Sequence, residues 1–596
     1  MSQVYYVDEC KRKVASVRCG YNDVSCRISQ FNPEGVQGMA QKMTGARAFA
    51  QMLKAYGVSH VFFMDAILRR ALAEMEDVGI KRILGHSEKA VAYMADGFAR
   101  ISGRPGICMS QSVGAANLAS GMQDPYLGHS PVIAITGRHV APFQYRNSYQ
   151  EVQHAPLYEA VTKFHAQIDT LEQIPSLMRQ AFREATTGTP RPVHLDIAGL
   201  TGDAITPLEG SFDIVADDAH TRFPAFRPGP DPAAVEKASV AIKAASRPVI
   251  IVDRGAVISG AADALARFAD RIQAPVVSTL DAKDIMVEDH PLYRGALGLY
   301  GRSCANHVVA EADLVIYAGC NTSDHTTANW LMPKDGTAII QIDLDPVEIG
   351  RNYSRVIGIQ SDVRAALVAL AAAAGAAKRD DWLSHTMKFV TEWRAEADKA
   401  RASDEVPVRP ERICQELTEL LPKDAILVSD TGYAALWSGT LVYLRHPTQR
   451  YIRAAGSLGW SFPASLGARC AAPDRTVVCF CGDGGFYYHL PELETARRRG
   501  IKTVTVVNNN RSLAQGLRNL NIAYQGRDET RKGECFEFLP TDFAAVAKSF
   551  GCFGVTVEKP ADFRKAFDAA LASDLPAVID VKTVFGHQAP MAWVPS

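Results

Sequence analysis

"CGDGGFYYHLPELETARRRGIKTVTVVNNNRSL" (residues 481–513) is the stretch that decides the fold. The apolar run that leads into it ends in glycines around Asp483, which predicts a buried strand followed by a glycine turn. Apolar residues then recur at helical spacing until Gly500, and a second apolar run ends in three asparagines. A strand, a helix and a strand in this order form a β–α–β unit with parallel strands. We therefore expect Asp483 and Asn510 to face each other across a crevice at the carboxyl ends of these strands.

The composition of the chain excludes several classes of protein. Its 596 residues are too many for one hydrophobic core and indicate about three or four domains. The net charge of −1 gives no broad attraction to nucleic acid or to a membrane surface, and no apolar run approaches the ~20 residues that span a bilayer. The first residues lack the apolar segment of a signal peptide, and the 12 cysteines, spread thinly along the chain, fit a reduced protein. These features predict a cytoplasmic protein with no nucleic-acid or membrane partner.

Three segments of the chain repeat an alternation of strands and helices. Short apolar runs alternate with amphipathic helical stretches in each of three segments, residues 43–205, 230–376 and 405–590. Such alternation predicts parallel sheets with helices on both faces. The predicted fold class is therefore α/β, with three doubly wound parallel-sheet domains. Residues 1–42 have no clear period, and we interpret this N-terminal extension as a tail or an upstream start rather than a docking element.

The residues at the predicted crevice suit a magnesium ion that carries a phosphate group. Carboxylate and amide oxygens are ligands that Mg²⁺ prefers, and glycine amides at a helix N-terminus bind phosphate. A Gly-Asp-Gly turn alone is weak support, because ordinary turns share it. Together with a helix that contains Glu-Leu and a strand that ends in Asn-Asn, it resembles the thiamine diphosphate signature of the 2-oxoacid decarboxylase and acetohydroxyacid synthase superfamily.

This resemblance implies a metal site and a diphosphate site. Asp483, Asn510 and the backbone carbonyl of Ser512 match the positions that hold the metal in this family. The third asparagine in the run leaves Asn509 as an alternative to Asn510. The glycines of the turn match the positions beside the diphosphate, and these are Gly482, Gly484 and Gly485. Thiamine diphosphate and Mg²⁺ are the implied cofactors. Residues 405–590 are the implied diphosphate-binding domain.

Two further stretches resemble the part of the family that activates the cofactor. In "HSEKAVAYMADGFAR" (86–100), within the implied pyrimidine-binding domain, Glu88 matches the glutamate that contacts the aminopyrimidine ring and promotes proton transfer. The alternative is that Glu88 only begins a helix. In "RAAGSLGWSFPASLGA" (453–468), the carbonyl of Gly456 matches the contact to the ring amino group, and Leu458 matches the apolar residue beneath the bent cofactor. A strand–turn–helix core explains these glycines equally well.

Other stretches resemble the acetolactate-synthase-like branch of the superfamily. "SQSVGAANLASG" places Gln111, Gly114 and Asn117 near the cofactor, although Asn117 also fits a helix cap. "SYQEVQHAPLYEAVTKF" (148–164) places Gln150 in the lining of the active site. The family builds each active site from two chains, so the resemblance implies a homodimer or a homotetramer.

Two departures from the family pattern leave the substrate open. The family usually has a glycine loop after its first helix, whereas this chain has Phe63, Met64 and Asp65 there. Phe63 and Met64 would narrow the donor pocket, and Asp65 either supplies a carboxylate or starts the next helix. The stretch after Asn510 also lacks the tryptophan expected in true acetolactate synthases.

Three hypotheses on function follow. The first is a thiamine-diphosphate-dependent lyase, decarboxylase or carboligase that acts on a 2-oxo acid or a 2-hydroxyketone. The second is an enzyme of the 2-hydroxyacyl-CoA lyase or oxalyl-CoA decarboxylase type, against which the short C-terminal tail argues. The third is a non-catalytic regulatory subunit with the same fold, against which the presence of Glu88, Asp483 and the asparagines argues.

The middle segment leaves a second cofactor open. In this family the central, nucleotide-binding-like domain binds FAD, ADP or no nucleotide. Asp343, in "QIDLDPVEIGRN" (341–352), matches a carboxylate that contacts an adenosine ribose. The glycines expected earlier in this domain are replaced by "DAKDIMVEDHP" (281–291), whose acids disfavour a nearby phosphate.

Overall fold

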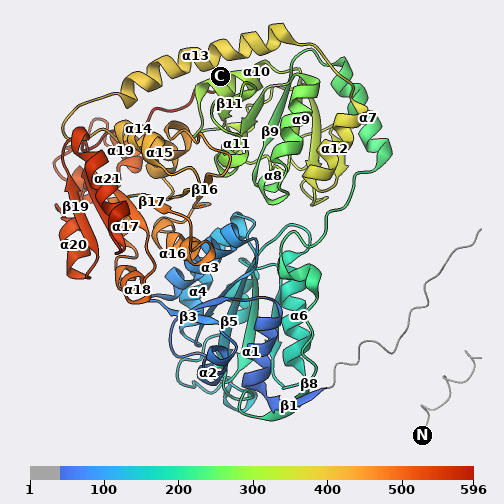
Figure 1. Cartoon of the computed structure of the whole chain (residues 1–596), viewed down its shortest axis with the longest axis vertical. Coiled ribbons are helices and arrows are strands. Elements are labelled where there is room, and N and C mark those ends of the chain that lie inside the picture. Colours follow the sequence, from blue (N-terminus) through green and yellow to red (C-terminus); the bar gives the residue numbers. More distant parts are fainter. Residues whose placement is uncertain (1–39, 596) are drawn as a thin grey trace, which may run out of the picture. The chain divides into compact units, whose positions relative to one another are not determined.

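The computed structural model describes residues 40–595 and contains three six-stranded parallel sheets (Figure 1). This confirms the predicted α/β class. Of the expected N-terminal extension, residues 1–39 lie outside the described residues, and the next ones enter β1 (Gln41–Thr44), which pairs antiparallel with β8 (Glu209–Phe212). Among residues 40–595, no helix has both the length and the apolar character needed to cross a bilayer. The cytoplasmic location stays a prediction.

The first sheet changes strand order between β2 and β4, so the carboxyl ends of these two strands border a crevice. In spatial order its strands are β3 (Lys81–Leu84), β2 (His60–Phe63), β4 (Gly106–Ser110), β5 (Val132–Arg138), β7 (Val193–Ala198) and β6 (His165–Ile168). Its helices are α1 (Gly45–Ala55), α2 (Arg69–Asp77), α3 (Glu88–Ser102), α4 (Gly114–Leu127), α5 (His154–Glu159) and α6 (Gln173–Thr186).

The central sheet changes order between β9 and β12. In spatial order its strands are β11 (Tyr293–Ala296), β10 (Val276–Ser278), β9 (Pro248–Val252), β12 (Leu314–Ala318), β13 (Ala338–Asp343) and β14 (Ile357–Gln360). Its helices are α7 (Pro232–Ala244), α8 (Arg254–Ile258), α9 (Ala262–Ile272), α10 (Ser303–Glu311), α11 (Asp324–Thr327) and α12 (Val363–Ala373), with the 3₁₀ helix η3 (Leu280–Ile285). The 22-residue helix α13 (Asp380–Arg401) then leads to the third sheet.

The third sheet changes order between β15 and β17. In spatial order its strands are β16 (Arg450–Arg453), β15 (Ile426–Ser429), β17 (Val477–Gly482), β18 (Val504–Asn509), β20 (Ala577–Lys582) and β19 (Phe553–Val557). Its helices are α14 (Pro410–Leu420), α15 (Tyr433–Leu441), α16 (Ser461–Ala471), α17 (Asp483–Tyr487), α18 (Glu492–Arg499), α19 (Leu517–Ala523), α20 (Phe543–Ser549) and α21 (Phe563–Ala572).

The β–α–β unit predicted around Asp483 is confirmed, with one difference. Strands β17 and β18 are parallel neighbours, and Gly500 ends the helix between them in a left-handed conformation. The expected helix in residues 489–500 is α18, and a second, short helix, α17, forms where the sequence predicted only a glycine turn. Pro491 lies between them, and a proline inside a helix lacks the backbone N–H that a continuous helix needs.

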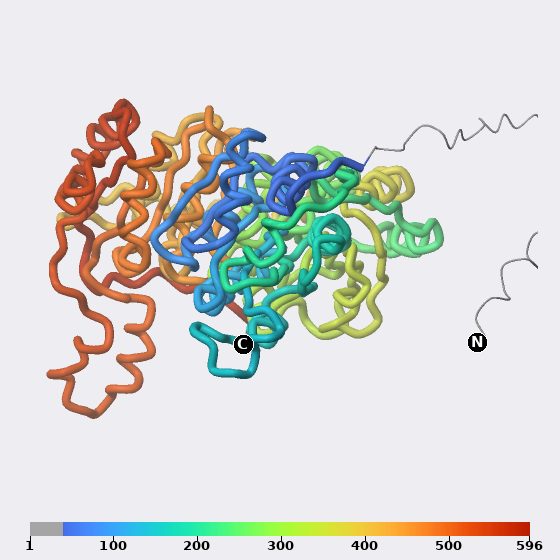
Figure 2. Tube along the Cα trace, turned by 90° about the horizontal axis from the view of Figure 1, so that it is seen from below, coloured from blue at the N-terminus to red at the C-terminus, as the bar shows by residue number. Residues whose placement is uncertain are grey.

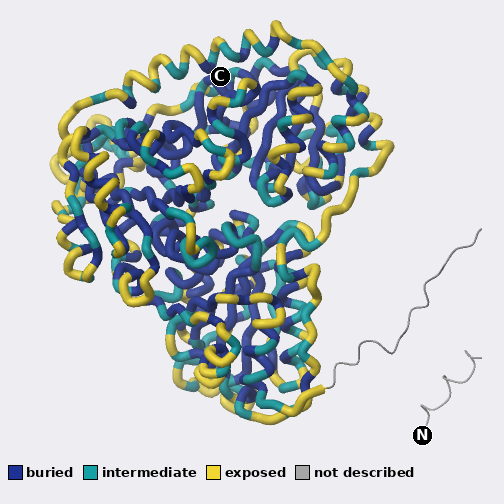
Figure 3. The backbone as a smooth tube through the Cα atoms, viewed as in Figure 1, coloured by how far each residue is buried: buried dark blue, intermediate teal, exposed yellow. Residues whose placement is uncertain are grey.

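Each sheet is buried between helices, as the dark strands in Figure 3 show. The first and third sheets are joined by the close packing of α3 on α16 (Figure 1). A Cβ atom on Gly97 would lie 2.0 Å from the carbonyl oxygen of Ala464, and one on Gly467 would lie 1.8 Å from that of Met94. The two helices therefore pack backbone to backbone, which fixes the middle of α3 against α16 of the third domain.

Candidate active site

The carboxyl end of β17 brings Asp483 into a buried position. Asp483 is the first residue of α17, and only 2% of its surface is exposed. Its carboxylate accepts hydrogen bonds from the backbone N–H groups of Gly484 (2.9 Å) and Ser512 (3.1 Å). Burial raises the pKa of Asp483 to about 7, because these amides only partly offset the loss of water.

Asn510 follows β18 directly and lies beside Asp483. Its Oδ1 atom accepts hydrogen bonds from the backbone N–H and the hydroxyl of Ser512, each at 3.1 Å. We call Asp483, Gly484, Asn510 and Ser512 the third-sheet cluster. Among residues 40–595, no three His, Cys, Asp or Glu side chains gather as a metal site. A metal at this cluster would therefore be held by one carboxylate together with amide and backbone oxygens, which suits Mg²⁺.

The neighbouring asparagines differ from Asn510 in their contacts. Asn509 donates hydrogen bonds through Nδ2 to the carboxylate of Asp580 (2.8 Å) and to the carbonyl oxygen of Thr541 (3.1 Å). Its side chain is therefore occupied in the core, and the oxygen beside Asp483 comes from Asn510. The Oδ1 atom of Asn508 is buried and has no hydrogen-bond partner among the described residues.

Glu88 is the first residue of α3, so it does begin a helix, although the helix cap is Ser87. Its half-buried carboxylate accepts a hydrogen bond from Nδ2 of Asn117 (3.3 Å). Gly114 lies against the same carboxylate, because a Cβ atom on Gly114 would lie 2.7 Å from Oε1 of Glu88. Asn117 lies inside α4 and does not cap it, since the cap position is Val113.

Gln111 and Gln150 are brought together through Ser112. Gln111 directly follows β4, and the hydroxyl of Ser112 donates a hydrogen bond to the backbone carbonyl of Gln150 (2.7 Å). Gln150 has a left-handed backbone (φ +60°), and its Oε1 atom is buried with no hydrogen-bond partner among the described residues. Nε2 of His154 lies 3.0 Å from the carbonyl oxygen of Ser112, and its Nδ1 lies 3.0 Å from Asp196. We call Glu88, Gln111, Gly114, Asn117 and Gln150 the first-sheet cluster.

Gly456 and Leu458 lie on the loop between β16 and α16. Both line a cleft of about 620 Å³, which residues of the first and central sheets also line. Leu458 is half-buried, and a Cβ atom on Gly456 would meet no atom within 4 Å. The backbone at Gly456 is therefore open to the cleft.

Sequence reasoning missed two buried carboxylates that hold this loop. Asp124 accepts hydrogen bonds from the backbone N–H groups of residues 455–457, and Asp430 accepts them from those of Gly459 and Ser461 (3.0 Å each). Burial raises the pKa of both carboxyl groups. The stretch "SDTG" that contains Asp430 was a usable signal, whereas no motif marks Asp124.

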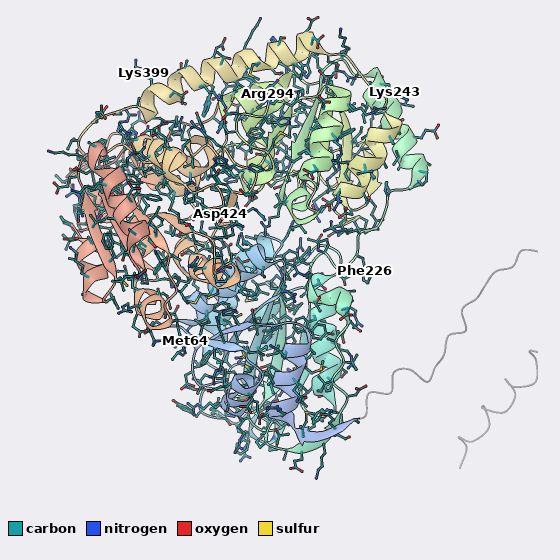
Figure 4. All side chains as sticks on the ribbon, viewed as in Figure 1. Met64, Phe226, Lys243, Arg294, Lys399 and Asp424 are labelled. Atoms are coloured by element: carbon teal, nitrogen blue, oxygen red, sulfur yellow. The ribbon has the colours of Figure 1, made fainter. Side chains whose placement is uncertain are left out.

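The loop after β2 departs from the expectation for Asp65. The helix α2 starts at Arg69 after the cap residue Leu68, so Asp65 does not start it. The side chain of Asp65 is 54% exposed and forms an ion pair with Arg69 (2.9 Å). Met64, labelled in Figure 4, follows the last residue of β2. Its backbone N–H donates a hydrogen bond to the carbonyl oxygen of Met109 (3.0 Å).

The segment that follows Ser512 is largely exposed. It contains α19, in which no residue is buried. Figure 2 shows this orange-red segment extending away from the sheet to which it belongs. The stretch that lacks the expected tryptophan is thus mostly exposed within its own chain.

Asp343 ends β13 in the central sheet and lines a separate cavity of about 50 Å³. The cavity is smaller than the ~300 Å³ at which ligand pockets begin. Burial and the neighbouring carboxylates raise the pKa of Asp343 to about 7. Asp253, at the carboxyl end of β9, accepts hydrogen bonds from the hydroxyl of Thr279 and the backbone N–H of Arg254, and burial raises its pKa to about 6.

The predicted site residues thus form a first-sheet cluster, a third-sheet cluster and the 455–458 loop, with Asp343 apart from all three. Within residues 40–595, no hydrogen bond joins the first-sheet cluster to the third-sheet cluster. Each cluster is built at the carboxyl ends of strands next to a change in strand order, which is where open α/β sheets bind ligands.

Comparison with known proteins identifies this arrangement. Three family models match the chain: the N-terminal TPP binding domain of thiamine pyrophosphate enzymes at residues 43–157, their central domain at 235–370 and their C-terminal TPP binding domain at 430–581. The chain belongs to the thiamine pyrophosphate enzymes, and its cofactor is thiamine diphosphate.

Its relatives specify the branch. The chain is 33% identical over 554 residues to a probable acetolactate synthase large subunit of Methanocaldococcus jannaschii, covering 90% of this chain and 92% of that protein. It is 30% identical over 544 residues to the acetolactate synthase isozyme 2 large subunit of Escherichia coli, covering 90% and 95%. These similarities confirm the acetolactate-synthase-like branch and favour an enzyme over a non-catalytic subunit.

Proposed function

We propose that this enzyme uses thiamine diphosphate and Mg²⁺ to make or break a carbon–carbon bond next to the carbonyl group of a 2-oxo acid or a 2-hydroxyketone. The observation that carries the proposal is the third-sheet cluster, where a buried carboxylate and an amide oxygen converge on one backbone N–H group. Bound thiamine diphosphate supplies an electron sink for the carbanion that such a reaction requires.

The residues of the third-sheet cluster fit a metal diphosphate. Asp483 and Asn510 would hold Mg²⁺ through their oxygens, with the carbonyl of Ser512, while the amides of Gly484 and Gly485 would bind the diphosphate. The raised pKa of Asp483 supports this role, because a divalent cation stabilises the charged carboxylate in a buried position.

The residues of the first-sheet cluster fit the activating end of the cofactor. Glu88 would hold a proton at a ring nitrogen of the aminopyrimidine, with its carboxylate oriented by Asn117 and limited in movement by the contact at Gly114. Gln111 and Gln150 would contact the substrate side, where the Oε1 atom of Gln150 has no protein partner among the described residues.

We also propose that two chains form each active site. The absence of hydrogen bonds between the two clusters in the described part of one chain supports a homodimer as the smallest functional unit, or a homotetramer made from two such dimers. In this arrangement Glu88 of one chain acts on a cofactor held by Asp483 of another.

The substrate is proposed to be small. Phe63 ends β2 and Met64 follows it, at the positions where the family has its glycine loop, and both side chains are half-buried. The C-terminal tail packs against α10. There the backbone N–H of Trp593 donates to Ser303 (2.9 Å), and the Trp593 ring stacks on His307 at a centroid distance of 3.7 Å. The tail therefore does not support the alternative of an acyl-CoA substrate.

We propose that the central domain binds neither FAD nor ADP. A nucleotide diphosphate at the central sheet would meet the carboxylates of Asp253 and Asp343 at the strand ends, and the cavity beside Asp343 is only about 50 Å³. Two buried carboxyl groups that stand where the diphosphate would lie cannot donate the hydrogen bonds of backbone amides when they are ionised, and this disfavours such a ligand.

The experiment that tests the proposal is a calorimetric titration of the cofactor-free protein with thiamine diphosphate, with and without Mg²⁺. We expect saturable, metal-dependent binding that Asp483→Ala abolishes. Glu88→Gln should keep binding but lose turnover of pyruvate by about 100-fold or more, because only the acid–base step is removed. Failure of the unaltered protein to bind the cofactor would sink the proposal.

A further inference from the structure

We propose that Asp124 is a positioning residue that fixes the backbone of residues 455–458 for contact with the cofactor. The inference rests on the proposed function, because the role of Gly456 and Leu458 depends on it. Asp124 lies in α4, which belongs to the first sheet, whereas the loop belongs to the third sheet. The carboxylate of Asp124 thus sets the conformation of a loop that belongs to a different sheet.

The carboxylate of Asp124 uses both oxygens to bind three consecutive amides. Oδ1 accepts a hydrogen bond from the N–H group of Ala455 (3.0 Å), and Oδ2 accepts from those of Gly456 (3.1 Å) and Ser457 (2.9 Å). Charge-assisted hydrogen bonds of this kind are stronger than neutral ones. Three bonds to one rigid group leave the loop few alternative conformations.

The charge of Asp124 is balanced inside the protein. Its side chain is fully buried, and Arg100, also buried, donates a hydrogen bond from Nη2 to Oδ1 (2.9 Å). Arg100 also pairs with Asp96, which in turn accepts a hydrogen bond from Nε1 of Trp460 (2.8 Å). Loss of one partner from a buried ion pair leaves the other charge buried and unpaired, which is costly. Asp124, Arg100 and Asp96 are therefore held in one geometry.

The loop that results carries a backbone acceptor without a hydrogen-bond partner among the described residues, at a residue that lines the cleft. No hydrogen bond to the carbonyl oxygen of Gly456 is present among residues 40–595, although its N–H group is bound by Asp124. The residue is exposed at the cleft that Leu458 also lines. Asp430 fixes the other end of the loop through Gly459 and Ser461. An unpaired carbonyl between two fixed ends suits a donor such as the amino group of the aminopyrimidine ring.

Hydrogen–deuterium exchange of the peptide that covers residues 454–459 tests the anchoring without any cofactor. We expect strong protection in the unaltered protein and, in Asp124→Asn, exchange that is faster by about 100-fold. The matched control is Asp284→Asn. Asp284 is also a buried carboxylate that binds an arginine (Arg450, 2.6 Å) and a backbone N–H (Tyr451, 3.2 Å), but it contacts the strand before the loop. This control should leave the 454–459 peptide protected.

Enzyme assays test the positioning role. With the cofactor bound, Asp124→Asn should lower kcat by about tenfold or more, while KM and the Kd for thiamine diphosphate stay within about threefold, because the third-sheet cluster is untouched. Asp284→Asn should keep the basal kcat even if it lowers the thermal midpoint equally. Rapid exchange of the loop in the unaltered protein, or equal kinetics in the two variants, would overturn the proposal. If the unaltered protein binds no cofactor, the proposed function fails and the positioning role fails with it, whereas exchange alone still reports whether Asp124 holds the loop.

Discussion

The carboxylate of Asp483 and the side-chain oxygen of Asn510 accept hydrogen bonds from the same N–H group, that of Ser512, at 3.1 Å each. The register of the third sheet causes this convergence, because Gly482 of β17 pairs with Asn508 of β18 and both strands end at one edge. A single N–H group cannot fully satisfy two acceptors, and the Ser512 hydroxyl that also reaches Asn510 can rotate away, so both oxygens are available to a cation.

This relationship predicts different effects for two adjacent asparagines. Asn510→Ala should weaken metal-dependent binding of thiamine diphosphate by about 10- to 100-fold with little change in thermal midpoint, because it removes one metal ligand. Asn509→Ala should lower the free energy of unfolding by about 1–3 kcal/mol, because the buried carboxylate of Asp580 loses a hydrogen bond. The affinity for thiamine diphosphate should not change. Calorimetric titration and thermal unfolding of both variants check this. The reverse pattern would assign the metal ligand to Asn509.

The sequence predicted the convergence of Asp483 and Asn510, because it depends on strand periodicity and on the topology of one β–α–β unit. Asp124 was beyond reach, since its partners lie 331–333 positions away in the chain and its helix gives no sign of which loop it meets. The short helix α17 was not predicted, because the glycines around Asp483 indicate a turn and disfavour a helix locally. For Asn117, a place near the cofactor and a helix cap both fit the motif, and the structure removes the cap by placing Asn117 inside α4 beside Glu88.

Gln150 offers a test of the substrate side. We expect Gln150→Asn to lower turnover by about tenfold, because the shorter side chain draws its amide away from the site, while asparagine still tolerates the left-handed backbone. The Kd for thiamine diphosphate should change little. The matched control is Gln153→Asn, an exposed glutamine three positions later, which should keep full activity. Steady-state kinetics and a cofactor titration measure both effects, and equal activity of the two variants would remove Gln150 from the site.

Because carboxyl groups lie at the strand ends of the central sheet, we expect the purified protein to contain no bound flavin. Purified protein should show less than about 0.1 equivalent of FAD or ADP after denaturation, because carboxylates at the ends of β9 and β13 oppose a diphosphate. Absorbance spectra and chromatography of the released nucleotides measure this. Excess FAD should leave the thermal midpoint unchanged, while thiamine diphosphate with Mg²⁺ should raise it by mass action. A yellow protein with one flavin per chain would contradict the expectation.

The raised pKa of Asp343 predicts how stability depends on pH. Burial, followed by the charges of Glu348, Asp345 and Asp253, raises it to about 7, against about 3.9 in an unfolded chain. Between these values the folded chain binds more protons than the unfolded chain, so the stabilising effect of the neutral carboxyl is lost as pH rises from about 4 to about 7. Compared with Asp343→Asn, the unaltered protein should therefore lose about 1–3 kcal/mol of stability between pH 5 and pH 8.

Urea unfolding at several pH values measures this difference in stability. The control is Asp335→Asn, which removes an exposed carboxylate near the same sheet and should show no such difference. If the unaltered protein and Asp343→Asn follow parallel pH curves, the pKa of Asp343 is not raised in the folded chain, and its charged carboxylate would oppose a nucleotide diphosphate at the central sheet more strongly.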